Sequence, residues 1–401
     1  MPSTEMLMAE VDFAHDDVPD LHQRLEELRR HGPVVPVRYH GERVWLILDH
    51  APLKQVFEDY DHFDPARGYS LIAEPSQGRT IQTMSGEEHR ISRGLVTPPF
   101  LPMRVRGLIE EIMEPIANEL LDRIEGRDEV DLVTAFTRPY PFLIITRLLG
   151  IPMDDEEKLL GWALKLIDFP WDPEGSVKAK RDFDAYMQRI LDARRREPTG
   201  DFISMLVQAE YEGERLSDER VLSFLGLLFP AGSDTSYKNA GSLFACVLAD
   251  PALRQRALRS DKDRELIVTE ALRWQPPTAL LPRMASADIE LGGVRIRAGD
   301  WTLFGITAAN ADPKVYPDPR RFDPDRDNRD ILTFGRSKHF CLGMHLARRE
   351  LETALRIVLE RFPDMRIKPG AEVEFVGAVL RGPRELIVQP HGEHAERRQC
   401  A

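Results

Sequence analysis

One cysteine lies in a loop whose neighbours could stabilise a thiolate. Cys341 sits in residues 334–343, which read F-G-R-S-K-H-F-C-L-G, and a helical pattern follows at once. Free backbone N–H groups and the helix dipole at such a position lower the pKa of a thiol. The flanking glycines let the backbone approach a large flat group. The stretch therefore predicts a loop that presents the Cys341 sulfur to a bound ligand.

Two less specific interpretations fit the same loop. Cys341 could be a structural cysteine, since most buried cysteines are inert. His339, Cys341 and His345 could also be metal ligands. A zinc site uses four ligands, usually in closely spaced pairs, and no second Cys or His pair lies near this stretch. Zinc is therefore disfavoured, whereas an inert cysteine stays open on this loop alone.

A second candidate group interrupts the longest apolar helix that the sequence predicts, over residues 217–249. Residues 234–236 read D-T-S inside the apolar run, and a buried carboxylate is costly unless something requires it. Pro230 and Gly232 loosen the turn just before them. The alternative is a proline-kinked core helix with a capped polar turn. One stripe of this helix carries Leu228, Ala231 and Thr235.

Two further pairs have helical spacing. His89 and Arg93 are four residues apart and share a helix face, which could be a solvated basic face or an anion site. An arginine suits a carboxylate because its planar fork binds both oxygens. Glu270 and Arg273 are three apart and can form an ion pair, although most such pairs lie on the surface.

Five motifs, taken in order, resemble those of the cytochrome P-450 family. The cysteine loop matches F-G-x-G-x-H-x-C-x-G followed by L-A-R, residues 231–236 match A-G-x-[DE]-T-[TS], and Glu270 and Arg273 match E-x-x-R. Residues 309–313 and 319–322 resemble A-N-R-D-P and P-x-R-F. Ser337 stands where the family usually has glycine, and Ala311 where it has arginine. Each motif alone is weak, but their order and spacing are specific.

The resemblance implies haem b as cofactor, with Cys341 as the axial ligand of the iron. It implies an acid–alcohol pair, Asp234 and Thr235, as catalytic residues, and Ala231, Phe334 and Gly343 in contact with the cofactor. The haem propionates would be bound by His89, Arg93, Arg283 and His339. A buried structural network behind the cysteine loop would comprise Glu270, Arg273 and Arg321.

The implied activity is that of a monooxygenase of the soluble bacterial class, which inserts one oxygen atom from O2 into an apolar small molecule. Electrons would come from NAD(P)H through a reductase and a ferredoxin that docks near the Cys341 face. An apolar pocket is expected from Leu71, Phe169, Trp171, Leu228, Leu280, Leu281 and Val379. A peroxide-driven haem-thiolate enzyme and a non-catalytic haem-thiolate sensor or carrier are the alternatives, and the intact Asp234–Thr235 pair disfavours both.

The elements that would position these residues are mainly helical, with a small β-rich region near the N-terminus and haem between the long helix and the Cys341 loop. The patterns predict hairpins at residues 34–48, 289–296 and 375–388, and an extended segment at 276–283. Helices are expected at 51–58, from 86 to 100, and over most of 105–215 with a break at 169–173. Residues 66–79 lack a clear period and are expected to form a loop. Ser217 suits a helix N-cap.

Composition narrows the class further. The chain has 401 residues, of which 42% are hydrophobic, and a formal net charge of −13, which argues against nucleic-acid binding. Three cysteines suggest a reducing compartment. The N-terminus carries no basic segment with an apolar run, so neither a signal peptide nor a membrane anchor is expected, and the cytoplasm is the expected location. No linker or repeat is evident, which predicts one domain over residues 1–401, with 1–20 and 391–401 flexible.

Overall fold

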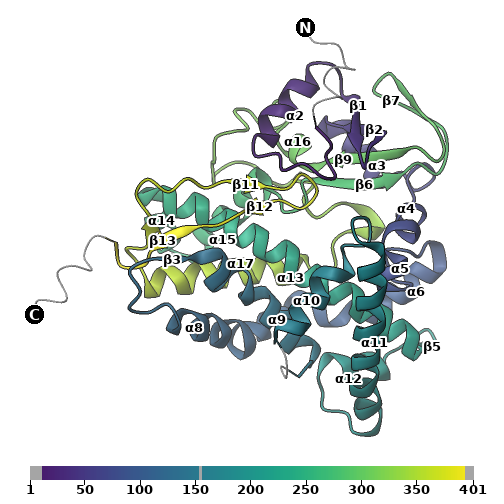
Figure 1. Cartoon of the computed structure of the whole chain (residues 1–401), viewed down its shortest axis with the longest axis horizontal. Coiled ribbons are helices and arrows are strands. Elements are labelled where there is room, and N and C mark those ends of the chain that lie inside the picture. Colours follow the sequence, from purple (N-terminus) through teal and green to yellow (C-terminus); the bar gives the residue numbers. More distant parts are fainter. Residues whose placement is uncertain (1–10, 153–155, 393–401) are drawn as a thin grey trace, which may run out of the picture.

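The structure is a computed structural model that describes residues 11–152 and 156–392. Helices dominate it, and the long helix α13 (Asp218–Ala249) runs through the middle of the helical part (Figure 1). Around α13 pack α9 (Pro139–Leu149), α15 (Asp261–Trp274) and α17 (Met344–Arg361). The mainly helical fold class expected from the sequence is confirmed.

Helix α13 begins and ends where the sequence indicates. The Ser217 hydroxyl accepts a hydrogen bond from the backbone N–H of Arg220 at 3.3 Å, which caps the first turn. The helix stops before Pro251, and Pro230 lies inside it. Most of its side chains are buried, because a helix that is apolar nearly all round must run through a core.

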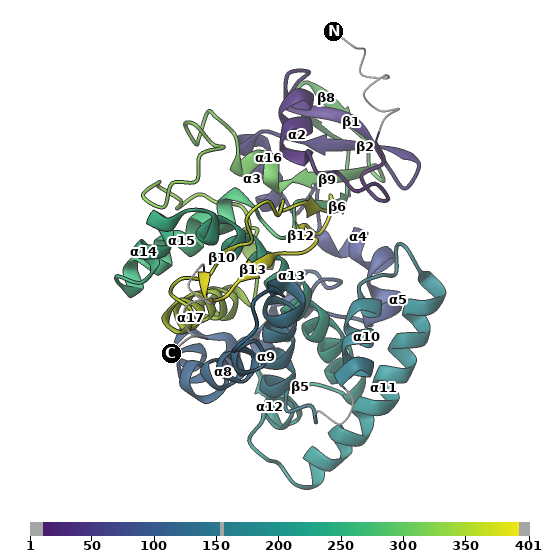
Figure 2. The ribbon, with the colours of Figure 1, turned by 60° about the vertical axis from the view of Figure 1, so that its left-hand side comes forward.

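The β-rich region is a four-stranded sheet near the N-terminus, with strand order β1-β2-β9-β6. Strands β1 (Val34–Tyr39) and β2 (Glu42–Ile47) form the expected antiparallel hairpin. Strand β9 (Trp301–Gly305) runs parallel to β2 and antiparallel to β6 (Leu280–Met284). The sheet lies beside the helical part, next to α2 (Leu21–Arg29), α3 (His50–Glu58) and α16 (Ile306–Asn310) (Figures 1 and 2).

The other strands are short and pair locally or across the C-terminal part. The three-stranded sheet has the order β10-β13-β3. The remaining pairs are β4-β5, β7-β8 and β11-β12. Their bounds are β3 (Val130–Asp131), β4 (Glu210–Tyr211), β5 (Glu214–Arg215), β7 (Ile289–Leu291), β8 (Val294–Ile296), β10 (Arg366–Ile367), β11 (Phe375–Val376), β12 (Gly382–Pro383) and β13 (Ile387–Gln389).

The remaining helices cover the core from outside. They are α6 (Gly86–Val96), α7 (Pro102–Leu108), α8 (Glu114–Asp122), α10 (Glu156–Leu166), α11 (Pro173–Arg196), α12 (Phe202–Gln208) and α14 (Pro251–Ala257). The predicted break at 169–173 separates α10 from α11. Within the described ranges, no helix combines the length and the apolar character that crossing a bilayer requires.

One expectation about the secondary structure was wrong. Residues 66–79 are not a loop, because α4 (Pro65–Ile72) and α5 (Glu74–Gln77) occupy most of them. The Asp64 carboxylate accepts a hydrogen bond from the N–H of Ala66 at 3.0 Å and so caps the N-terminus of α4. This capping residue lies just before residues 66–79. Within residues 11–20, part of the segment expected to be flexible, Phe13 and Val18 are buried. Residues 1–10 and 393–401 lie outside the described residues.

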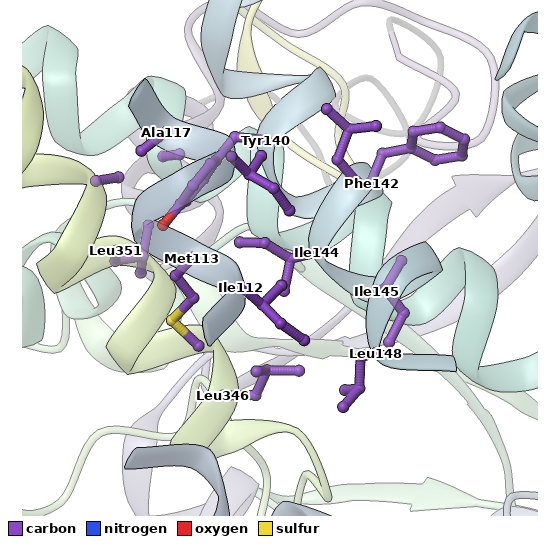
Figure 3. Close-up of a cluster of buried hydrophobic side chains, with 14 of the residues drawn as sticks. Ile112, Met113, Ala117, Tyr140, Phe142, Ile144, Ile145, Leu148, Leu346 and Leu351 are labelled. Carbon is purple, nitrogen blue, oxygen red and sulfur yellow. The ribbon is translucent and has the colours of Figure 1, made fainter. Parts of the chain in front are cut away.

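The main core joins α9 to α8 and α17. Figure 3 shows Tyr140, Ile144 and Ile145 of α9 beside Ile112, Met113 and Ala117, with Leu346 and Leu351 of α17 nearby. All of these side chains are buried. Because protein interiors are close-packed, this cluster fixes α17, and with it the loop that precedes α17, relative to the rest of the helices.

A buried ion pair on α15 holds the chain behind the Cys341 loop. The Arg273 guanidinium donates to both oxygens of Glu270, at 2.8 and 2.6 Å, and both side chains are almost fully buried. Arg273 also donates to the carbonyls of Asn310 and Pro319. Asn310 in turn accepts from the N–H of Leu332, just before the loop. The expected pair therefore belongs to a network that extends to the cysteine loop.

The third member of this network differs from the expectation. Arg321 is exposed and contributes its backbone carbonyl, which accepts from Arg273 at 3.4 Å. The second cation near Glu270 is Arg326, whose Nε lies 3.6 Å from the carboxylate. Asn328 and the N–H of Asp323 complete its contacts. The short motif around 321 marked the right segment but the wrong side chain.

Replacing Glu270 should strongly destabilise the fold. Glu270→Ala leaves Arg273 buried without its charge partner, so we expect the free energy of unfolding to fall by about 3–5 kcal/mol. Urea denaturation followed by circular dichroism measures it. The matched control is Lys262→Ala, which removes an exposed i, i+3 pair with Glu265 on the same helix and should cost less than about 1 kcal/mol. Equal losses in the two variants would contradict a structural role for the buried pair.

Candidate functional site

A large internal cavity separates α13 from the Cys341 loop. The loop contributes Phe334, His339, Cys341 and Gly343 to its lining, and α13 contributes Leu228, Ala231 and Thr235. The two walls come from segments about a hundred residues apart in sequence. Helix periodicity accounts for the α13 side, because residues 228, 231 and 235 lie on one face.

The cysteine loop is held by its own backbone. The N–H of Cys341 donates to the carbonyl of Phe334 at 2.9 Å, which closes the loop. Gly335 has a φ of 66°, in the left-handed region that favours glycine. Gly343 lies directly before α17, so Cys341 stands three residues before Met344, the first residue of the helix. The loop thus presents its sulfur to the cavity at a helix N-terminus, as the spacing predicts.

The charge state of Cys341 results from opposing influences. Its side chain opens to the cavity, which lies deep in the protein, and burial raises the pKa of the thiol above its usual value. The N–H groups of Gly343 and Met344 and the Arg93 guanidinium act in the opposite direction. The expectation of a lowered thiol pKa is therefore corrected: burial outweighs the helix terminus. A cation bound to the sulfur itself would favour the thiolate.

Cationic and donor groups line one side of the cavity without carboxylate partners. The Arg93 guanidinium donates to the carbonyl of Phe340 at 2.5 Å, and Arg283 to that of Pro282 at 2.9 Å. Neither forms an ion pair with a carboxylate among residues 11–152 and 156–392. Desolvation lowers the pKa of Arg93. This set fits a ligand that brings its own carboxylates into the cavity.

The two predicted histidines act as a stacked pair. The rings of His89 and His339 lie 4.0 Å apart between centroids, and His339 lines the cavity while His89 lies behind it. The buried Nε2 of His89 has no hydrogen-bond partner in the described structure. Burial lowers the pKa of both imidazoles, that of His339 to about 3, so both rings are neutral near pH 7. Their part in anion binding would be as N–H donors.

Tyr60 is a cavity residue that the sequence analysis missed. Its hydroxyl accepts from the backbone N–H of His339 at 2.9 Å and lies 3.1 Å from Nδ1 of the same histidine. Tyr60 therefore fixes both the loop and the histidine ring. It follows α3 by two residues, and no spacing or motif in that region distinguishes it.

The acid–alcohol pair is divided between two sides of α13. The Thr235 hydroxyl lines the cavity and donates to the carbonyl of Ala231 at 2.9 Å. Asp234 is buried but does not line the cavity, and its Oδ1 lies 2.6 Å from Nζ of Lys238. The sequence analysis overlooked Lys238, although its i, i+4 spacing from Asp234 was a readable signal.

Five of the seven expected pocket residues lie elsewhere. Leu228 and Leu281 line the cavity, whereas Leu280 and Val379 pack into the core beside the sheet. Leu280 and Leu281 are consecutive in β6, so they point to opposite faces. Leu71 is 54% exposed, Phe169 lines a shallow depression on the surface, and Trp171 is 38% exposed with its indole N–H bonded to the carbonyl of Ala14. The apolar lining instead includes Ile81, Ile145 and Phe304.

Ser337, which departs from the expected glycine, adopts a conformation that glycine would adopt without strain. Its φ is 61°, in the left-handed region. Ser337→Gly should therefore raise the free energy of unfolding, by about 1 kcal/mol. Thermal unfolding against wild type measures it. Ser337→Ala keeps the Cβ and serves as the control, which should gain nothing. A Gly variant no more stable than the Ala variant would contradict backbone strain at this position.

Comparison with known proteins agrees with this geometry. The family model for cytochrome P450 matches residues 11–263 and 265–376. The mycinamicin IV hydroxylase/epoxidase of Micromonospora griseorubida is 34% identical, with 91% of this chain and 94% of that protein covered. The 6-deoxyerythronolide B hydroxylase of Saccharopolyspora erythraea is 31% identical, with 93% and 96% covered.

Solved structures are similar over the same extent. The cytochrome P450 PksS of the Bacillus subtilis 168 bacillaene polyketide synthase superposes with a TM-score of 0.85 at 28% identity, covering 92% of this chain and 97% of that one. CYP109E1 from Bacillus megaterium, solved with testosterone, gives a TM-score of 0.81 at 28% identity and covers 92% and 99%. The match of family model, relatives and fold shows that the chain belongs to the cytochrome P450 family of monooxygenases.

Proposed function

We propose that this protein inserts one oxygen atom from O2 into an apolar small molecule bound in the cavity between α13 and the Cys341 loop. The observation that carries the proposal is the arrangement of that cavity. A cysteine sulfur lies on one wall, a threonine hydroxyl lies on the opposite helix, and the lining between them is mostly apolar. Apolar walls suit an apolar substrate, because an apolar molecule leaves few polar groups of the cavity without a hydrogen-bond partner.

The residues present fit haem b, the cofactor of this family. Haem iron with a thiolate ligand supplies the activation of O2. Cys341 is the residue that would bind the iron, because its sulfur opens into the cavity at the start of α17. Arg93, Arg283 and His339 would bind the propionates, with His89 stacked behind. Their lack of carboxylate partners among the described residues supports this assignment.

Thr235 is the residue placed to handle protons at the cavity wall. Its hydroxyl can accept one hydrogen bond while it donates another. Asp234 precedes Thr235 on the helix and is the candidate to resupply a proton to it. To do so, Asp234 would first have to break its ion pair with Lys238. Because most of the cavity lining is apolar, protons would be supplied there by such side chains.

The electron donor we propose is an acidic ferredoxin, reduced by NAD(P)H through a separate reductase, in the cytoplasm. Residues 336–349 contain four arginines and lysines and no Asp or Glu, although the whole chain has a net charge of −13. Lys338 and Arg349 of this segment are exposed. A local positive surface next to the cysteine favours an acidic partner.

The identity of the axial ligand can be read from a spectrum. The reduced protein with carbon monoxide should show the red-shifted Soret band of a thiolate-ligated haem, and Cys341→His should lose it because the sulfur is gone. Cys246→Ala, which removes a half-buried cysteine of α13, should retain the band. An imidazole-type spectrum in the wild-type protein would refute the assignment of Cys341.

The part played by Thr235 can be read from the fate of the electrons. Thr235→Ala should retain haem and ligand binding but divert NAD(P)H electrons to hydrogen peroxide, whereas Thr235→Ser keeps the hydroxyl and should stay coupled. Asp234→Asn should lower kcat by about 10²-fold with less peroxide. A substrate found by its Soret shift, with a surrogate redox chain, allows NAD(P)H, product and peroxide to be measured together. Tight coupling in Thr235→Ala would leave Thr235 as a helix-packing residue.

A further inference from the structure

We infer that Lys238 is a positioning residue of the proton relay, which holds Asp234 outside the cavity and connects it through Tyr237 to the surface. The inference rests on the proposed function and concerns residues that the family motif does not include. It follows from the contacts on the outer side of α13, one turn beyond the Asp234–Thr235 pair.

The contacts form a short chain from the helix interior outward. Nζ of Lys238 lies 2.6 Å from Oδ1 of Asp234 and 2.9 Å from the hydroxyl of Tyr237. The Asp234 side chain is 5% exposed and that of Lys238 is 16% exposed. The phenol of Tyr237 is only half-buried. The two side chains that follow Asp234 in this chain of contacts are therefore both more exposed than Asp234 itself.

Asp234 is only partly satisfied by this contact. Its second oxygen, Oδ2, is buried and has no hydrogen-bond partner in the described structure. A buried carboxylate with one unpaired oxygen is costly, so Oδ2 is the oxygen that can still accept a hydrogen bond from a new partner. The ion pair fixes the Asp234 carboxylate through Oδ1 and leaves Oδ2 unpaired. A carboxylate that exchanges hydrogen-bond partners during a proton transfer needs such an unpaired oxygen.

The rest of the fold covers Lys238 rather than leaving it in solvent. Strand β12 packs on α13, and a Cβ added at Gly382 would lie 2.8–2.9 Å from carbon atoms of Lys238, so only glycine fits there. Arg138, which precedes α9, lies over the ring of Tyr237 at 5.4 Å, and Lys238 lies over the same ring at 4.4 Å. Asp234 and Tyr237 raise the pKa of Lys238 despite its burial, so the ammonium stays charged.

The charged groups near the Asp234–Lys238 ion pair determine the effect of removing the Lys238 ammonium. Lys238 and Tyr237 approach Asp234 from α13, and Arg138 lies over Tyr237 from the start of α9. The two residues of β12, Gly382 and Pro383, carry no charge. Without the ammonium, Asp234 would be a buried carboxylate with no cation in contact. Burial then favours its protonated form, and the connection to Tyr237 that reloads it is broken.

The test uses the haem-loaded full chain and four variants: Lys238→Met, Lys238→Arg, Asp234→Asn and the double variant of Lys238→Met with Asp234→Asn. Lys238→Met should slow turnover by about tenfold or more and raise the solvent isotope effect. Lys238→Arg should restore most of the rate. The double variant should be no slower than Asp234→Asn alone, because both changes interrupt one pathway.

A second measurement does not depend on turnover. In the infrared, Lys238→Met should show a protonated carboxyl band at neutral pH that is absent from Lys238→Arg and from the double variant. Wild-type rate and isotope effect in Lys238→Met, with a slow Asp234→Asn, would overturn the role of Lys238 but leave Asp234 as the acid. Additive losses in the double variant would overturn the shared pathway. A normal rate in Asp234→Asn would overturn both the inference and the proposed relay.

Discussion

The structure depends on keeping a potential thiolate inside an apolar interior. Burial alone opposes charge on Cys341, and two backbone N–H groups and one arginine offset it in part. The loop that carries the sulfur is fixed from three sides: by its own Phe334–Cys341 hydrogen bond, by Tyr60, and by the chain of contacts that begins at Glu270 and Arg273. The same few residues therefore serve both stability and chemistry, because the network that stabilises the fold also fixes the position of the Cys341 sulfur.

Helix α13 resolves a second conflict, between an apolar cavity and a supply of protons. Successive residues on a helix point about 100° apart, so Thr235 can face the cavity while Asp234 faces away from it. The acid can remain ionised and paired with Lys238 on the outer side, and the alcohol alone meets the substrate space. Sequence-adjacent residues thereby experience very different surroundings.

The sequence predicted the frame of the site better than its details. Cys341, the α13 stripe and the cap at Ser217 follow from motif and periodicity, which are local properties. The errors depended on long-range packing. Leu280 was assigned to the cavity because strand direction cannot be read from the residue type, and Arg321 stood in for Arg326 because the burial of a cation depends on where its neighbours fold. Trp171 looked like a pocket aromatic until the contact with Ala14 placed it on the surface.

That contact with Ala14 has a consequence for how firmly the two parts of the fold are joined at the surface. The indole of Trp171, at the corner between α10 and α11, is bonded to the N-terminal segment and lies 5.4 Å from the ring of His40, in the β1–β2 turn. It thus joins the helical part to the β-rich part on the outside of the molecule. One such hydrogen bond is worth about 1 kcal/mol net, which favours the joined form by only about fivefold. This hydrogen bond alone would therefore break and form again often, so the outer contact between the two parts of the fold is a weak one compared with the buried core.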